Sequence, residues 1–254
     1  AKKLFNDAQE MLKKIIDGKM VTANGAIGFY PCNAVGDDVE IYSDATRSKV
    51  IANFRFLRNQ QKREDNSSNN ALSDFIKPVE SGDIDYLGLF AVTAGINADT
   101  WAKYYQDQLD DYNSIMVKVL SDRLAEAFAE LMHERVRKEF WGYDKDEHLA
   151  VTQMLKEEYR GIRPAPGYPA CPEHSEKLVL FNLLDTEGKT GIQLTENYAM
   201  YPAASVSGFY FAHPEANYFG LGKISKDQLE DYAVRKGITV EQAEKYLNTN
   251  LNYQ

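Results

Sequence analysis

The sequence has few of the features that mark metal-binding, secreted or membrane proteins. It contains only two cysteines, Cys32 and Cys171, which lie far apart and lack the spacing of a zinc site. We therefore expect two reduced thiols in a cytoplasmic protein. No apolar run approaches the roughly 20 residues that cross a bilayer, and no signal peptide is visible. The chain begins directly with a helical pattern at Ala1, which we interpret as an excised domain or a chain that has lost its initiator methionine.

Basic charge and glycine-rich phosphate loops are also lacking. Lysine and arginine number 29 against 38 aspartates and glutamates, which gives a net charge of -9. Because nucleic acids and anionic lipids both select basic surfaces, we expect neither a nucleic-acid partner nor a membrane partner. No G-x-G-x-x-G or Walker loop occurs, so a bound nucleotide would be held by neither device.

Hydrophobic periodicity predicts a single α+β domain. Helical spacing is expected at 3–17, 97–110, 111–140, 149–158, 173–184, 226–236 and 240–247. Strands are expected at 26–32, 39–42, 50–57, 86–92, 198–200, 207–213 and 218–224. Since strands occur early and late around a central block of long helices, we expect a mostly antiparallel twisted sheet built from both ends of the chain.

Three details of this prediction depend on particular segments. The strand at 50–57 is expected to run into a helix, and the almost wholly polar segment 58–70 is expected to be a mobile loop. A hairpin is expected around Gly36-Asp37-Asp38. The apolar stripe of the long helix is predicted to comprise Val117, Leu120, Leu124, Ala127, Phe128 and Leu131.

The strongest local feature is a proline-rich segment, residues 163–172, that contains half of the eight prolines of the chain. Proline fixes φ and has no N–H, so this segment should be a stiff strip with free carbonyls, interrupted by the permissive Gly167. Such a strip can line a ligand, with Arg163 gripping a carboxylate through two bonds and Tyr168 offering a ring and a hydroxyl. It can equally be a rigid connector with Arg163 in a structural ion pair.

An acidic row on the long helix is the second candidate. Asp122, Glu126 and Glu130 are spaced four apart and His133 follows three later, which places them on one side of a helix. This row can hold a cation or a metal, but a di-metal bundle needs two Glu-x-x-His pairs and only one is present. A solvated polar face is the simpler interpretation, and we predict no metal site.

No catalytic nucleophile is predicted either. Cys171 lies close to His174 in sequence, but closeness in a stiff loop does not create the geometry of a nucleophile and its base. The aromatic segments 209–211 and 218–219 can stack an adenine ring, or they can be sheet core. From the residues alone, the chemistry therefore stays open between ligand binding and a purely structural role.

A longer match narrows this choice. Residues 161–174, with the sequence Gly-Ile-Arg-Pro-Ala-Pro-Gly-Tyr-Pro-Ala-Cys-Pro-Glu-His, resemble the activation domain of cobalamin-dependent methionine synthase. Further strings agree in the same order along essentially the whole chain: Gly36-Asp37-Asp38, Asp74-Phe75, Asp111-Tyr112-Asn113, 122–137 and 205–208. The resemblance implies one C-shaped domain over residues 1–254 that binds S-adenosylmethionine in a shallow groove. It also implies that the N-terminal part of the family domain is lacking.

The resemblance implies a role inside a larger enzyme. The parent methyltransferase of methionine biosynthesis carries a methyl group from 5-methyltetrahydrofolate to homocysteine by way of cobalamin, which another domain holds. The activation domain would present S-adenosylmethionine for reductive methylation of inactive cob(II)alamin, with an electron from flavodoxin or a diflavin reductase. The isolated domain would have no full turnover. An alternative is a docking module that caps the cobalamin domain and recruits the reductase with little ligand binding of its own.

The resemblance also carries a set of site residues. The ligand contacts of the family match Arg163, Ala165, Gly167, Tyr168 and Tyr218, with Phe219 beside the last. Arg163 would pair with the ligand carboxylate, the backbone of the proline-rich segment would hydrogen-bond the ligand, and Tyr218 would stack on adenine.

Charge and two departures complete this expectation. Glu126 and Glu157 match acidic positions near the sulfonium, whose positive charge a negative field stabilises. Phe219 stands where the family usually has a second tyrosine, so a hydroxyl is missing there. The family also has an upstream aspartate just before a tryptophan, and no Asp-Trp pair occurs in this chain.

Overall fold

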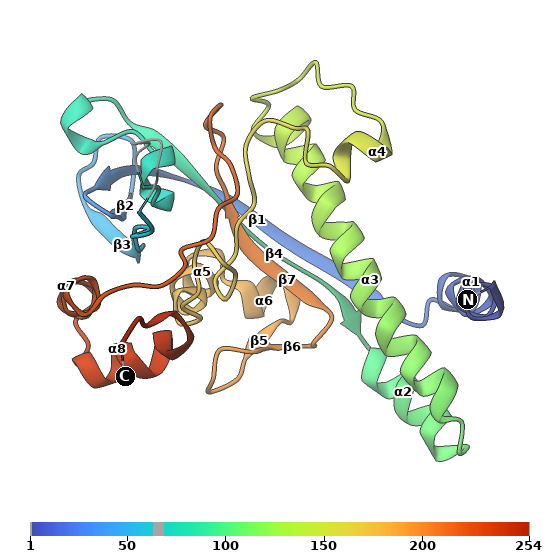
Figure 1. The fold of residues 1–254 in the computed structure, drawn as a ribbon. Helices are drawn as coiled ribbons and strands as arrows, with labels where there is room; N and C mark the ends of the chain where they lie inside the picture. The colour runs from blue at the N-terminus through green and yellow to red at the C-terminus, as the bar shows by residue number, and fades with distance from the viewer. Residues whose placement is uncertain (1, 63–68, 254) are drawn as a thin grey trace.

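Five strands form one antiparallel sheet, in the order β3-β2-β1-β4-β7 (Figure 1). The computed structural model describes residues 2–62 and 69–253. The strands are β1 (Thr22–Val35), β2 (Asp38–Tyr42), β3 (Val50–Arg55), β4 (Asp85–Ile96) and β7 (Ser205–Tyr210). All four neighbouring pairs are antiparallel, and β7 joins the early strands from late in the chain. The predicted α+β class is therefore confirmed.

The helices cover both faces of this sheet (Figure 1). They are α1 (Lys2–Asp17), α2 (Ala98–Asp107), α3 (Asp111–Arg135), α4 (Val151–Met154), α5 (Glu176–Leu184), α6 (Thr186–Thr190), α7 (Lys226–Lys236) and α8 (Val240–Leu247). A π-helical turn, Val136–Phe140, continues α3, and three short 3-10 turns lie at Leu72–Phe75, Val79–Ser81 and Asn248–Asn250. A second, two-stranded sheet pairs β5 (Gln193–Leu194) with β6 (Met200–Tyr201). Within the described ranges, none of the helices combines the length and the apolar character that crossing a membrane demands.

Local sequence chemistry explains the elements that match the prediction. Gly36 adopts φ +60° in the turn of the β1–β2 hairpin, a conformation that glycine takes without cost. Gly237 adopts φ +72° and ends α7 where the sequence places its stop. Strand β4 is buried along almost its whole length, because α3 packs near one face and α5 and α6 near the other. Continuous burial is what its unbroken apolar run predicts.

Several expected elements are corrected by tertiary contacts. Among the described residues 56–62, no helix follows β3, and the guanidinium of Arg58 pairs with Asp37 and Asp74 instead. Residues 218–224 form no strand, since the Leu221 N–H donates to the carbonyl of Pro169 rather than to a sheet. The expected helix at 149–158 shortens to α4, and 198–200 contributes only the start of β6. For the loop expected at 58–70, residues 63–68 lie outside the described residues.

The buried face of α3 also differs from the predicted stripe. Besides Ser114 and Met116 near its start, its buried residues follow a spacing of four: Val117, Ser121, Ala125, Ala129 and His133. Ala127 and Leu131 are exposed instead. Small side chains bring the helix close to β4 and β7. The ring of Phe128 reaches β1, where a Cβ added at Gly25 would lie 3.1 Å from it. The face of α3 that is buried is therefore the one with small side chains, which allow close packing on the sheet, and not the one with the larger apolar side chains.

His133 accordingly leaves the acidic row. Its ring is fully buried and stacks on Tyr210, with centroids 5.2 Å apart. Burial, together with Arg137 and Arg163, lowers the pKa of His133 well below its ordinary value, so the ring is neutral. Across residues 2–62 and 69–253, no group of three or more metal-binding side chains gathers.

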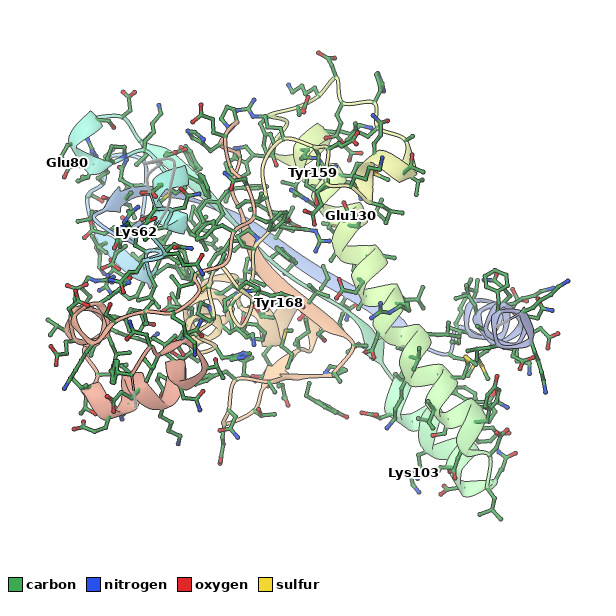
Figure 2. The ribbon with its side chains drawn as sticks, in the orientation of Figure 1. Lys62, Glu80, Lys103, Glu130, Tyr159 and Tyr168 are labelled. Atoms are coloured by element: carbon green, nitrogen blue, oxygen red, sulfur yellow. The ribbon has the colours of Figure 1, made fainter. Side chains whose placement is uncertain are left out.

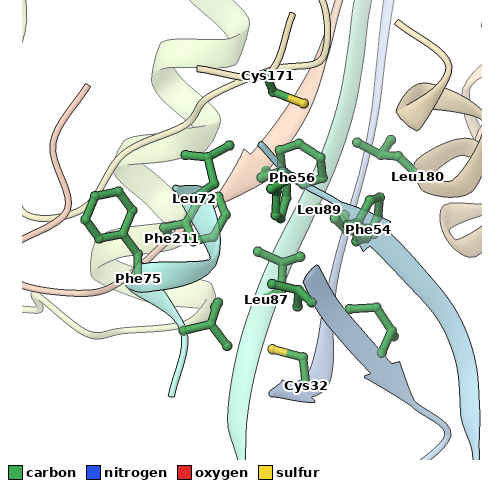
Figure 3. Close-up of a cluster of buried hydrophobic side chains, with 14 of the residues drawn as sticks. Cys32, Phe54, Phe56, Leu72, Phe75, Leu87, Leu89, Cys171, Leu180 and Phe211 are labelled. Carbon is green, nitrogen blue, oxygen red and sulfur yellow. The ribbon is translucent and has the colours of Figure 1, made fainter. Parts of the chain in front are cut away.

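The main core lies where β3, β4 and β7 meet the loops (Figure 3). Phe209 packs edge-on against Phe54 and Phe56, at centroid distances of 4.9 and 5.5 Å. Both cysteines are free thiols buried in this core, and burial raises the pKa of each well above its ordinary value. Neither is therefore a reactive thiolate, which removes the Cys171–His174 interpretation.

A buried ionic cluster fastens α7 to α5. The ammonium of Lys236 lies 2.5 Å from a carboxylate oxygen of Glu173 and 2.5 Å from one of Glu176. The two carboxylate side chains are only 3% and 2% exposed, and the hydroxyl of Tyr232 donates to Glu173 at 3.1 Å. Because Glu173 follows the proline-rich segment directly, this cluster also anchors the end of that segment.

Removing the ammonium should destabilise the whole fold. We expect Lys236→Ala to lower the free energy of unfolding by about 3–5 kcal/mol, since it leaves two buried carboxylates without their cation. Urea unfolding followed by circular dichroism measures this loss. Lys226→Ala is the matched control on the same helix, because its partner Glu230 lies 3.8 Å away in solvent. Equal midpoints for the two variants would contradict the assignment.

Candidate functional site

The proline-rich segment begins by pairing with the open edge of the main sheet. Ile162 and Phe211 exchange two backbone hydrogen bonds, of 3.1 and 3.0 Å, and the Phe209 N–H donates to the Pro164 carbonyl at 2.9 Å. Prolines have no N–H to donate, so they can meet a sheet edge only as acceptors. Gly208 permits the close approach, since a Cβ there would lie 2.5 Å from the Pro164 carbonyl oxygen.

The segment then turns sharply at Gly167. This residue has φ +96°, and its N–H donates to the Cys171 carbonyl at 2.7 Å. A Cβ added to Gly167 would lie 2.3 Å from the ring of His174. Burial and the nearby Lys177 lower the pKa of His174, so its neutral ring can accept from the Lys177 ammonium at 2.8 Å. Glycine is therefore required here by the backbone and by the ring beneath it.

A pocket of about 610 Å³ opens between this segment, α3 and residues 218–220. Seven of the eight predicted site residues line it: Glu126, Glu157, Arg163, Ala165, Tyr168, Tyr218 and Phe219. The eighth, Gly167, shapes the turn without lining the pocket. Its volume lies in the range of small-molecule sites. Residues that are up to 93 positions apart in the sequence thus meet around one cavity.

Sequence reasoning missed part of the lining. Pro164, Pro169, Ala170, Val206 and Gly220 also face the pocket. The first three belong to the segment already singled out, so extending the prediction to its whole length would have found them. Val206 lies on β7, and its orientation follows from the register with β4, which no local pattern specifies.

Arg163 is the one cation of the pocket lining within the described residues. Its Nη2 donates to Glu130 Oε2 at 2.9 Å, and its backbone N–H donates to the Tyr218 hydroxyl at 3.0 Å. Burial opposes its charge, but Glu130, Tyr218 and Tyr159 together raise the pKa of Arg163 above its ordinary value. The guanidinium therefore stays charged although its side chain is only 20% exposed.

The remaining charge of the pocket is negative. Glu126 comes from α3 and Glu157 from the turn after α4, where it adopts φ +58°. Burial raises the pKa of Tyr218, so its hydroxyl stays protonated and the ring is a neutral wall. One guanidinium with two carboxylates and aromatic rings suits a small ligand that carries both a carboxylate and a cationic centre.

Carboxylates and tyrosines are the only side chains of the described lining that could exchange a proton with a ligand. Over the described residues, the lining contains no cysteine, serine, histidine or lysine. A nucleophile with an adjacent base is thus missing, whereas shape and charge for binding are present. The fold and site define an α+β domain with a charged pocket of the size that small ligands occupy.

Comparison with known proteins identifies the family. The family model described as vitamin B12 dependent methionine synthase, activation domain, matches residues 1–237. A similar solved structure is the crystal structure of the MetH reactivation domain bound to AdoHcy. It has 51% sequence identity and a TM-score of 0.97, over 100% of this chain and 78% of that chain. The chain belongs to the activation-domain family of vitamin B12-dependent methionine synthase.

The role of Gly167 as a backbone requirement can be tested. We expect Gly167→Ala to lower the free energy of unfolding by about 3 kcal/mol, from positive-φ strain and the clash with His174 together. Gly82→Ala is the matched control, since Gly82 has φ +78° but nothing within 4 Å of an added Cβ, so only strain of about 1 kcal/mol remains. Thermal unfolding measures both. Equal losses of unfolding free energy in the two variants would mean that the clash with His174 does not destabilise the fold.

Proposed function

We propose that this chain binds S-adenosylmethionine in the pocket between α3 and the proline-rich segment. It would present the methyl group for reductive methylation of inactive cob(II)alamin, and so reactivate methionine synthase. The observation that carries the proposal is the gathering of Arg163, Tyr218 and two carboxylates around one cavity of suitable size. A relative of 51% identity bound to AdoHcy supports it, because AdoHcy is what remains of S-adenosylmethionine after the methyl group leaves.

Arg163 would hold the amino-acid end of the ligand. A guanidinium has five N–H donors, and Glu130 takes one of them in this structure. The others leave room for a carboxylate of the ligand. Since Arg163 stands at the start of a stiff segment hydrogen-bonded to β7, its backbone is fixed before the ligand arrives.

Aromatic side chains would hold the nucleoside end. Tyr218 and Phe219 both line the pocket, and the Tyr218 ring is fixed by the bond between its hydroxyl and the Arg163 N–H. Stacking of a base on an aromatic ring contributes about 1–3 kcal/mol. Phe219 supplies a ring face but no hydroxyl, so recognition there rests on stacking alone.

Glu126 and Glu157 would stabilise the sulfonium. A carboxylate attracts a sulfonium, more strongly at the half-buried Glu126 than at the exposed Glu157, and a sulfonium has no N–H or O–H through which to be held otherwise. The product of methyl transfer is a neutral thioether, which these carboxylates do not attract by charge. The same two residues would therefore favour the reactant over the product.

The methyl acceptor would come from elsewhere in the enzyme. Bound cobalamin supplies a cobalt centre that accepts the methyl group, and in this family it belongs to another domain of the enzyme. Cobalamin is accordingly assigned to another domain, and the electron to flavodoxin or a diflavin reductase. The methyltransferase activity would then belong to the assembled enzyme, with residues 1–254 as its reactivation domain.

Titration with S-adenosylmethionine tests the proposal. We expect saturable binding by calorimetry, weakened at least about tenfold in Arg163→Ala, because charge-assisted bonds to the carboxylate are lost. Arg163→Lys should bind S-adenosylmethionine almost as weakly as Arg163→Ala, since an ammonium cannot make a bidentate contact with a carboxylate. Arg123→Ala, at an exposed position of α3, should bind as the unaltered chain does. No heat at saturating ligand would favour the docking-module alternative.

Selectivity tests the two carboxylates. We expect Glu126→Gln and Glu157→Gln each to weaken S-adenosylmethionine more than AdoHcy, narrowing the ratio of their affinities about threefold to tenfold. Competition titrations with both ligands measure this ratio. Asp122→Asn removes a charge one turn away at an exposed position and should leave the ratio unchanged. An equal loss of affinity for S-adenosylmethionine and AdoHcy would indicate that the two carboxylates act through their shape and not through their charge.

A further inference from the structure

Glu130 lies behind the pocket rather than in it. It follows Glu126 by one turn of α3, so both project from the same side of the helix. Figure 2 labels Glu130 on α3 beside Tyr159. Glu126 faces the pocket, whereas Glu130 is not among the lining residues and instead contacts Arg163. The acidic row thus has two members with different surroundings.

Glu130 and Arg163 form one of the two hydrogen bonds that a carboxylate and a guanidinium can make side by side. Glu130 Oε2 accepts from Arg163 Nη2 at 2.9 Å, and the side chains are 26% and 20% exposed. Glu130 Oε1 and Arg163 Nε are both buried without a hydrogen-bond partner among the described residues. The carboxylate therefore takes one side of the guanidinium, and its second oxygen is sealed from the pocket.

We propose that Glu130 is a positioning residue that fixes the guanidinium of Arg163, so that its remaining donors face the carboxylate of the ligand. The inference rests on the proposed function and deepens it. An arginine side chain has many rotamers, and ordering them on binding costs affinity. A carboxylate that already holds one nitrogen removes part of that cost before the ligand enters.

Two other roles for Glu130 predict different behaviour. A direct contact with the ammonium of the ligand would require Oε1 to reach the pocket, but that atom is buried. A competitor that must leave Arg163 before the ligand carboxylate binds would weaken affinity, so its removal would strengthen binding. A positioning residue predicts the opposite sign.

The test compares two ligands that differ in the group Arg163 holds. AdoHcy carries the amino-acid end, and 5′-methylthioadenosine lacks it. We expect Glu130→Gln to weaken AdoHcy about tenfold and to leave 5′-methylthioadenosine unchanged. Glu134→Gln is the matched control, because Glu134 lies one turn further along α3 and pairs with Lys138 at 3.1 Å. It should leave both affinities unchanged.

A double-variant cycle tests whether Glu130 acts through Arg163. In an Arg163→Ala chain, Glu130→Gln should cause no further loss of AdoHcy affinity. A further loss there, equal weakening of both ligands, or stronger AdoHcy binding by Glu130→Gln would each overturn the inference. Thermal unfolding confirms that the variants fold. If the unaltered chain bound neither ligand, the proposed function itself would be overturned instead.

Discussion

The site depends on a short stretch of backbone pairing at the open edge of the sheet. Residues 162–164 hydrogen-bond to Phe209 in β7 and to Phe211 just after it, and Gly208 lets the Pro164 carbonyl approach. Prolines would disrupt a central strand, but at an edge their missing N–H groups have no ladder partner to lose. The stiff segment is thereby laid beside α3, and the space between them becomes the pocket. Arg163 is carried on the paired part, so its position is set by the sheet.

Charge is distributed differently in the two acidic regions of the protein. In the core, Lys236 is enclosed by Glu173 and Glu176, and all three side chains are nearly inaccessible. Around the pocket, Arg163 is the lone cation of the described lining, with Glu126 and Glu157 near it and Glu130 behind it. The core cluster satisfies its charges internally and acts as a fastener. The pocket leaves guanidinium donors and carboxylates uncommitted, which is the condition for recognising a charged ligand.

Elements governed by local chemistry could be predicted from the sequence, and those governed by tertiary contacts could not. Helices α7 and α8 and the hairpin at Gly36 follow from periodicity and turn residues. Residues 218–224 alternate like a strand, yet they run along the proline-rich segment, since the sheet edge they would need is already taken. Of the eight site residues expected from the family resemblance, seven line the pocket. The sequence identified Glu130 only as one member of a polar row. Its contact with Arg163 could not be predicted, because it depends on how a distant segment packs against α3.

The composition of the pocket suits a domain that would contribute to methyl transfer by binding alone. A sulfonium already carries an activated methyl group, so the domain needs to supply no acid, base or nucleophile. What it can supply is position and charge. In the proposed binding mode, Arg163 and the aromatic wall would hold the ends of the ligand, whereas Glu126 and Glu157 would act on the centre whose charge disappears in the reaction. Transfer of the methyl group would then remove the attraction of those two carboxylates and leave the other proposed contacts intact. The pocket would therefore weaken its hold on the ligand at the step after which the product must leave.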